Sequence, residues 1–247
     1  MFERLGVSPE TLNNIVQRLT GGRFRGDYNA YIAHLRNTLP QATWDTLYMV
    51  GIASIFAIVF GMIIGLFLYF TAPNGVYPMP IINKITGIIV NVGRSIPFVV
   101  LIMLVFPLSR HIVGTSVGST AAIVPLTIAA IPFMSRVVEA TLNELGQGII
   151  EAAISAGATT RQLIFRVILP EAAPGLVLGF TLLVINLVTF SAMAGMVGGG
   201  GLGDVAISYG MHRHRRDMLI YTVIILVLLV QIIQALGTFI SRKLDKR

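Results

Sequence analysis

Long runs of apolar residues without a charge alternate with short polar connections over most of this chain. About 20 consecutive apolar residues, at about 1.5 Å per residue, are enough for a helix to cross the hydrocarbon core of a bilayer. The pattern therefore predicts an all-α membrane protein with five transmembrane helices. The predicted spans are residues 46–70, 85–108, 112–135, 170–190 and 218–241.

Interruptions inside the runs modify three of these spans. Arg94 lies in the second run, and because a charge at mid-membrane is costly, we expect it near the start of that span or facing the protein interior. Pro125 and Pro132 remove helix hydrogen bonds and predict kinks in the third span. The fourth run continues without a charge to Asp204, which is too long for one span, so we expect the helix to end near Phe190 and a glycine-rich loop to follow.

The residues before the first span predict two short amphipathic helices. Ser8 is a suitable N-cap, apolar residues then repeat at helical spacing, and two glycines end the first helix, before a second apolar stripe begins at Tyr28. Arginines surround both stripes, which favours a position on the membrane surface or on the rest of the protein. We therefore divide the chain into an N-terminal amphipathic extension, residues 1–40, and a transmembrane domain, residues 41–247.

A polar segment, residues 147–169, separates the third and fourth spans. Its first part carries apolar residues on one helical face, and Gly157 stands where a left-handed C-terminal cap is needed. Thr159 and Gln162 match a capping box that begins a second helix, and Pro170 marks the junction with the next span. The segment predicts a helix-turn-helix projection. Periodicity alone favours an amphipathic connector in the lipid headgroups over a docking surface for another subunit.

The composition agrees with a membrane protein. Hydrophobic residues make up 55% of the 247 residues and charged residues only 12%, about half the share in soluble domains. The net charge of +7 indicates contact with anionic lipid surfaces and not with nucleic acid, because no basic and aromatic residues are interleaved. The chain has no cysteine, which excludes disulfides and thiolate chemistry. His212 and His214 lack neighbouring acidic ligands, so no metal site is expected.

Two nucleotide-binding motifs can be excluded. The chain has no G-x-x-x-x-G-K-[ST] sequence, so it has no P-loop with which to hydrolyse ATP. Glycines 198, 200 and 203 match G-x-G-x-x-G, but they follow an apolar span and not the strand of a soluble dinucleotide-binding fold. We expect no catalytic residue and no cofactor bound by this chain.

The distribution of positive charge does not assign an orientation. If the polar segment 147–169 is placed in the cytoplasm, the 18 lysines and arginines divide evenly, nine inside and nine outside. Orientation therefore has to come from another feature.

The residue types within the polar segment resemble the EAA signature of ABC importer permeases. Only Val167, where isoleucine is usual, departs from that signature. In that family the first short helix of the segment inserts into a groove on the ATP-binding subunit and transmits its movement to the spans. The resemblance implies a cytoplasmic coupling loop, and hence a cytoplasmic C-terminus and an outside N-terminus. The implied ATPase-coupling residues are Glu151, Ala152, Ala153, Gly157, Leu169 and Pro170.

Further motifs look like the permease subunit of methionine-type ABC importers in particular. They are residues 94–98 (RSIPF), 123–127 (IVPLT) and 191–203 (SAMAGMVGGGGLG), and the resemblance covers roughly residue 43 to the C-terminus. It implies a non-catalytic subunit that forms the translocation pathway for an amino acid, with methionine the expected substrate, by alternating access. The candidate pathway or gate residues are Ser95, Pro97, Ser191, Met193 and Gly195.

The same resemblance implies the partners and the location. We expect a homodimer in the bacterial cytoplasmic (inner) membrane, two copies of a cytoplasmic ABC ATPase subunit that bind MgATP, and an extracytoplasmic substrate-binding lipoprotein. A secondary transporter or channel for a small polar solute is the alternative. Such proteins usually carry ionisable residues in mid-membrane or inverted repeats, and Arg94 is the only such residue we find. A membrane-embedded enzyme would need converging His, Asp or Glu within the spans.

Overall fold

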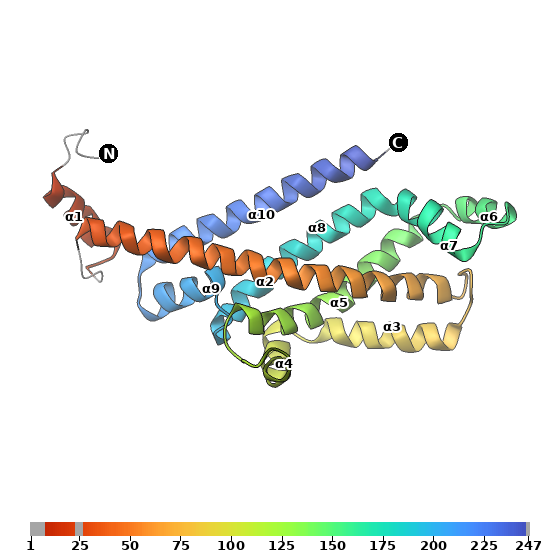
Figure 1. The fold of residues 1–247 in the computed structure, drawn as a ribbon, viewed down its shortest axis with the longest axis horizontal. Helices are drawn as coiled ribbons and strands as arrows, with labels where there is room; N and C mark the ends of the chain where they lie inside the picture. The colour runs from red at the N-terminus through yellow and green to blue at the C-terminus, as the bar shows by residue number, and fades with distance from the viewer. Residues whose placement is uncertain (1–7, 23–26, 246–247) are drawn as a thin grey trace.

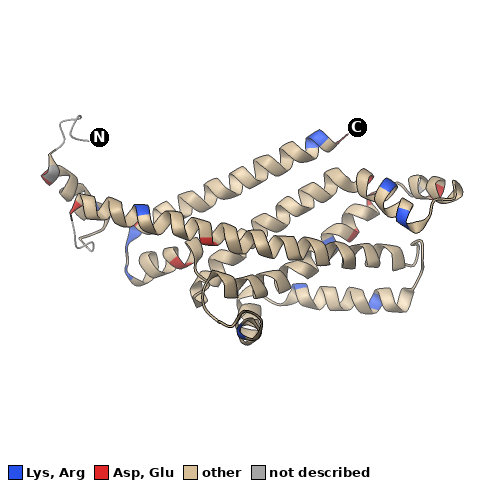
Figure 2. Ribbon diagram, in the orientation of Figure 1, with Lys and Arg blue, Asp and Glu red and all other residues tan. Residues whose placement is uncertain are grey.

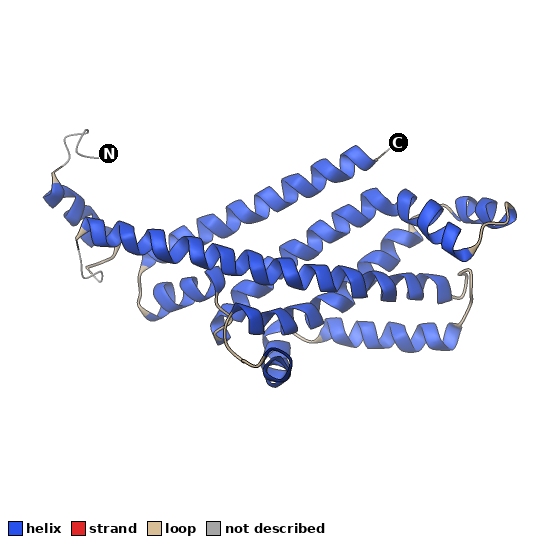
Figure 3. Ribbon diagram, in the orientation of Figure 1, coloured by secondary structure: helices blue, strands red, loops and turns tan. Residues whose placement is uncertain are grey.

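The computed structural model describes residues 8–22 and 27–245, and every regular element in that part of the chain is a helix (Figure 3). Parts of the predicted extension, residues 1–7 and 23–26, and the C-terminal Lys246 and Arg247 lie outside the described residues. The helices are α1 (Pro9–Leu19), α2 (Tyr28–Thr71), α3 (Pro80–Ser95), α4 (Phe98–Val113), α5 (Ser119–Asn143), α6 (Gln147–Ser155), α7 (Thr160–Gln162), α8 (Leu169–Ala194), α9 (Gly201–Val205) and α10 (Arg216–Leu244).

The described helices agree with the predicted all-α membrane class. Four are long and apolar enough to cross a membrane, and a fifth crossing is obtained if the bent pair α3 and α4 counts as one span. The long helices run side by side along one axis, with α1 and the N-terminus at one end and α6 and α7 at the other (Figure 1). We call these the α1 end and the α6 end. The C-terminus lies toward the α6 end, and most charged residues lie toward the two ends (Figure 2).

The core is built mainly between α2 and α5. Small residues of α2 let α5 approach closely: a Cβ atom added to Gly61 or Gly65 would collide with Met134 or Val138. Both α5 side chains are fully buried at these contacts. Close packing of this kind replaces the hydrophobic effect as the main attraction between helices in lipid.

The second short helix predicted for the extension and the first predicted span are one helix, because α2 continues through Pro40. At about 1.5 Å per residue its 44 residues extend about 66 Å, roughly twice the thickness of the hydrocarbon core. Leu35, Leu39 and Ala42 pack against a separate apolar cluster formed by Leu202, Val205 and Met218. These contacts on both sides of Pro40 hold the helix together where the sequence alone predicted a boundary.

The second predicted span, residues 85–108, is not one straight helix. α3 and α4 meet at an angle of 103°. Pro97 has no N–H to continue the helix, and Ile96 before it adopts an extended conformation, as residues before proline usually do. The third predicted span also begins later than residue 112, because Gly114 ends α4 in the left-handed region and α5 starts only at Ser119.

The region after Phe190 was predicted to be a loop, and this prediction was wrong. α8 continues to Ala194 and is followed by a 3₁₀ turn, by α9, and by a π-helical stretch, Ala206–His212. The returning segment lies so close to α8 that a Cβ atom on Gly203 would overlap the backbone of Ala192, and one on Gly195 would overlap the backbone of Asp204. The glycines therefore serve close backbone packing here, and not only flexibility.

We expect Gly203→Val to lower the thermal stability of the purified protein. The added side chain meets backbone atoms that cannot rotate away, and overpacking of this kind costs about 1–3 kcal/mol. Thermal unfolding in detergent measures the change. Gly51→Val is the matched control, because a Cβ atom at Gly51 meets no atom within 4 Å. Equal unfolding temperatures for the two variants would contradict the close packing.

Candidate functional site

The turn after α6 is fixed by hydrogen bonds between backbone atoms. The N–H of Ala158 donates to the carbonyl of Ala153 (3.1 Å), and the N–H of Gly157 donates to the carbonyl of Ile154 (2.9 Å). Gly157 has φ +77°, the left-handed conformation predicted for it. This pair of bonds is the Schellman arrangement that ends helices at glycine. The direction in which the chain leaves α6 is therefore set locally.

The helix after the turn begins with the predicted capping box. The N–H of Gln162 donates to Thr159 Oγ1 (3.4 Å), and the N–H of Thr159 donates to Gln162 Oε1 (2.9 Å). α8 begins at Leu169, next to Pro170, where the junction with the next span was predicted, and the helical structure is not broken there. A π-helical stretch, Leu163–Ile168, leads directly into α8, and the wider turn reduces the clash of the proline ring with the preceding carbonyls. Helical structure is thus continuous from Thr160 to Val197.

The predicted coupling residues fall into an exposed group and a basal group. Glu151, Ala152 and Gly157 are exposed at the tip of the projection, whereas Ala153 and Leu169 are half-buried. Pro170 is exposed where the segment joins α8. The α6 helix is held down by Ile150, which is buried in the core. The exposed face of α6 is therefore presented by a fixed base.

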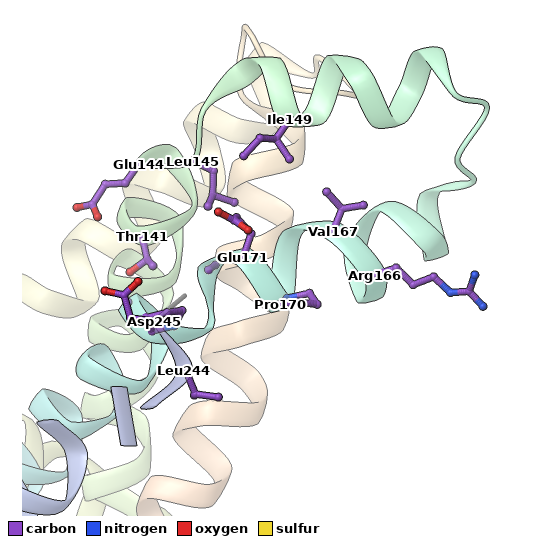
Figure 4. Close-up of a pocket in the computed structure, with 13 residues that line it drawn as sticks. Thr141, Glu144, Leu145, Ile149, Arg166, Val167, Pro170, Glu171, Leu244 and Asp245 are labelled. Carbon is purple, nitrogen blue, oxygen red and sulfur yellow. The ribbon is translucent and has the colours of Figure 1, made fainter. Parts of the chain in front are cut away.

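Two hollows flank the projection. The one in Figure 4, about 450 Å³, lies between the end of α5, the start of α8 and the end of α10, and Glu144, Glu171 and Asp245 contribute carboxylates to it. The second, about 530 Å³, lies between α6 and the connection from α2 to α3 and is bordered by Glu151 and Ile154. These hollows give the α6 end of the molecule an irregular surface on which another protein can seat.

The connection between α2 and α3 contributes contacts that the sequence did not indicate. Tyr77 Oη and Thr160 Oγ1 are hydrogen-bonded at 2.5 Å, which joins this connection to the first turn of the helix after Gly157. Asn83 Nδ2 donates to the carbonyl of Leu68 (2.7 Å) and fastens the start of α3 to the end of α2. Both contacts join residues distant in sequence, so no local pattern could have predicted them.

Among the candidate pathway residues, Ser95 and Pro97 lie at the bend between α3 and α4, whereas Ser191, Met193 and Gly195 lie at the end of α8 or directly after it. The rings of Phe98 and Phe190 stack with centroids 4.6 Å apart, which brings the bend against the end of α8. The set divides by burial. Ser95, Pro97 and Met193 are exposed on the protomer, whereas Ser191 and Gly195 are buried. The buried hydroxyl of Ser191 donates to the carbonyl of Val188 (2.7 Å).

A buried ionic cluster near the α1 end was not predicted. Arg215 and Asp217, only 5% and 4% exposed, form a salt bridge of 2.6 Å. Tyr31, from the part of α2 beyond its predicted span, donates its hydroxyl to Asp217 Oδ2 (3.0 Å) and places its ring 5.6 Å from the Arg215 guanidinium. We call Tyr31, Arg215 and Asp217 the outer clasp.

Protonation states in the outer clasp suit these bonds. Burial raises the pKa of the Tyr31 phenol well above its usual range, and the bond to Tyr221 and the charge of Asp217 add to the shift. The phenol therefore stays protonated and keeps donating to Asp217. Burial also lowers the pKa of the neighbouring His34, with Arg215 and Arg213 adding to the effect. The sequence did not predict this cluster, because Tyr31 lies 186 residues before Asp217.

Comparison with known proteins identifies the family. A family model described as the inner-membrane component of binding-protein-dependent transport systems matches residues 57–247. The chain belongs to this family. As an inner-membrane transport component it is a multi-pass membrane protein and not a catalytic subunit, and its membership does not favour the alternative of a secondary transporter or channel.

Individual members of the inner-membrane transport component family are similar over most of the chain. The probable D-methionine transport system permease protein MetI of Vibrio cholerae is 49% identical over 209 residues, which are 85% of this chain and 93% of the relative. The methionine import system permease protein MetP of Bacillus subtilis is 40% identical over 209 residues, which are 85% of this chain and 94% of the relative.

Solved structures of similar proteins agree with this assignment. A chain from the MetNI methionine ABC transporter in an inward-facing conformation superimposes with a TM-score of 0.83 at 42% identity, covering 84% of this chain and 96% of that one. A chain from an amino acid ABC transporter with histidines has a TM-score of 0.71 at 18% identity, covering 89% of this chain and all of that one. The second likeness concerns the fold alone.

Proposed function

We propose that this chain is the permease subunit of an ATP-driven importer that takes up methionine. The observation that carries the proposal is the α6 projection, which places Glu151 and Ala152 on an exposed helix held by a buried base and a fixed glycine turn. Relatives that are 40–49% identical over 85% of the chain are named as methionine permeases, which supports the substrate. The protein itself binds no nucleotide in this mechanism, and MgATP belongs to the partner ATPase.

The proposed assembly is a homodimer with two copies of a cytoplasmic ABC ATPase subunit and an extracytoplasmic substrate-binding lipoprotein. A similar structure is named as the MetNI transporter, an ABC transporter that contains more than the permease. The ATPase must meet ATP in the cytoplasm, so the α6 end faces the cytoplasm. The C-terminus, toward the same end, is then cytoplasmic, and the N-terminus is outside.

Coupling follows from the continuity of the helix after the turn. ATP binding closes the two ATPase subunits and draws the two α6 helices together. Because helical structure runs without a break from Thr160 to Val197, a displacement at Thr160 is carried to Phe190, which stacks on Phe98 at the bend between α3 and α4. The candidate gate is therefore connected to the motor by one helix, and hydrolysis allows the reverse movement.

Uptake by the reconstituted complex tests the function. Proteoliposomes that contain the permease, its ATPase and the binding lipoprotein are expected to accumulate labelled methionine only when ATP is present on the ATPase side. Excess unlabelled methionine should compete, whereas unrelated amino acids should compete weakly. A complex that contains a catalytically inactive ATPase is the control. Equal accumulation without ATP would support the alternative of a channel or a secondary transporter.

A further inference from the structure

Arg94 occupies an unusual depth for a charged residue. It lies 14 residues after Pro80 at the α6 end, about 21 Å along α3 at about 1.5 Å per residue. Its neighbour Gly93 packs against Pro132, which lies near the middle of α5, and a Cβ atom added to Gly93 would come within 2.8 Å of that ring. Arg94 is therefore level with the middle of a membrane-crossing helix, where an uncompensated charge is costly.

A second arginine nearby, Arg136, differs from Arg94 because it has partners for its charge within the protomer. Arg136 donates to the carbonyl of Gly87 (2.9 Å), to Asn91 Oδ1 (3.2 Å) and to Glu139 Oε2 (2.5 Å). Within the described residues Arg94 has no ion pair and no side-chain hydrogen bond, and it is exposed on the protomer. A membrane guanidinium in this state needs water or an anion from outside the protomer.

The surface beside Arg94 forms a shallow, open groove. It has a volume of about 470 Å³ and is lined by Arg94, Arg136, Glu139 and Asn143 together with Val137 and Ala140. Glu139 balances Arg136, so the groove carries one unmatched positive charge, that of Arg94. The lining residues of α5 continue toward its end at the α6 side, so the groove lies on the cytoplasmic side of the stacked pair Phe98 and Phe190 in the proposed orientation.

We propose that Arg94 binds the carboxylate of the transported amino acid on the cytoplasmic side of the gate. A free amino acid carries a carboxylate at neutral pH, and a guanidinium binds carboxylates through paired, charge-assisted hydrogen bonds. The passing substrate supplies the anion that Arg94 lacks within the protomer. This assignment rests on the proposed function and names the permease residue that recognises the carboxylate, which all amino-acid substrates share.

Charge rescue at a single cysteine tests the assignment, because the chain has no cysteine of its own. Arg94→Cys should lower ATP-dependent methionine uptake by about tenfold to a hundredfold, the effect of losing a hydrogen bond to a charged group. The solubilised complex, whose partner subunits are free of cysteine, is treated with 2-aminoethyl methanethiosulfonate before reconstitution. This reagent adds a positive charge at residue 94 and should restore much of the uptake. The sulfonatoethyl reagent adds a negative charge and should not.

Two further tests separate a specific role of the Arg94 charge from a general effect of altering an arginine. Arg110→Cys, at another exposed arginine in the last turn of α4, should keep normal uptake and respond to neither reagent. Arg94→Lys should retain more uptake than Arg94→Gln, and the loss in the latter should appear as a higher KM for methionine. Unchanged KM in Arg94→Gln, equal rescue by both reagents, or loss of the homodimer would overturn the assignment. A wild-type complex that takes up no methionine would instead refute the proposed function.

Discussion

Gly157→Val is expected to lower methionine uptake about tenfold while the assembled transporter continues to hydrolyse ATP. Gly157 has φ +77°, and a branched side chain in this region is strained by about 1–2 kcal/mol or more. Strain of that size shifts the equilibrium of the turn about tenfold away from its native shape. The α6 helix would still reach the ATPase, but its displacement would no longer be carried to α8 in the right direction. Parallel assays of uptake and phosphate release measure the effect.

Gly51→Val is the matched control for this prediction. Gly51 lies inside α2, outside the α6 projection, and a Cβ atom meets no atom within 4 Å at either glycine. The two substitutions therefore add the same side chain without a collision, and only Gly157 requires the left-handed conformation. Valine is also at least as compatible with a helix as glycine, so uptake should remain normal in Gly51→Val. Equal loss of uptake in both variants would show that the left-handed backbone conformation of the turn is not the cause of the loss.

Glu151→Lys probes the same coupling through charge instead of backbone shape. Glu151 is exposed on α6 beside the hollow between α6 and the connection from α2 to α3. Reversing its charge should weaken the contact with the ATPase and lower uptake at normal membrane levels of the permease. Glu10→Lys makes the same change of charge on α1, at the opposite end of the molecule, and should be neutral. Normal uptake in Glu151→Lys and in Gly157→Val would refute the coupling role.

The parts of the fold that the sequence predicted well are those set by local chemistry. The Gly157 turn and the Thr159 capping box depend on residues a few positions apart, and both are present in the structure. The apolar runs likewise place both ends of α8 and α10 to within four residues, because lipid solvation acts along each helix separately, whereas α2 begins 18 residues before its predicted span. The EAA-like spacing from Glu151 to Pro170 pointed to the family to which the chain belongs.

The features that the sequence did not predict depend on contacts between distant residues. The extension was divided from the transmembrane domain after residue 40, but α2 continues through Pro40 and packs against Leu202 and Met218. Pro97 was placed inside the second predicted span, but the chain bends by 103° there, and Phe98 after it stacks on Phe190. In the glycine-rich region, the sequence could not distinguish flexible glycines from glycines that allow two backbones to touch.

Asp217→Ala, a change in the outer clasp, is expected to lower the stability of the protein strongly. Removing the carboxylate leaves the Arg215 guanidinium 5% exposed and without its ionic partner. Breaking one side of a buried ion pair costs about 3–5 kcal/mol, because the remaining charge has lost both its partner and its water. The hydroxyl of Tyr31 loses the same acceptor, so one of the hydrogen bonds between α2 and the start of α10 is also lost. The unfolding temperature of the purified protein in detergent should fall by about 6 °C or more.

A double variant separates the buried charge from the shape of the site. Arg215→Met with Asp217→Ala removes both charges and should be more stable than Asp217→Ala alone, since apolar replacements of buried ion pairs are often tolerated. Asp45→Asn removes a carboxylate that accepts a hydrogen bond from Gln41 at an exposed site and should change stability by no more than about 0.5 kcal/mol. If the double variant is no more stable than Asp217→Ala, the cost does not come from the buried charge of Arg215, and the outer clasp stabilises the protein through packing instead.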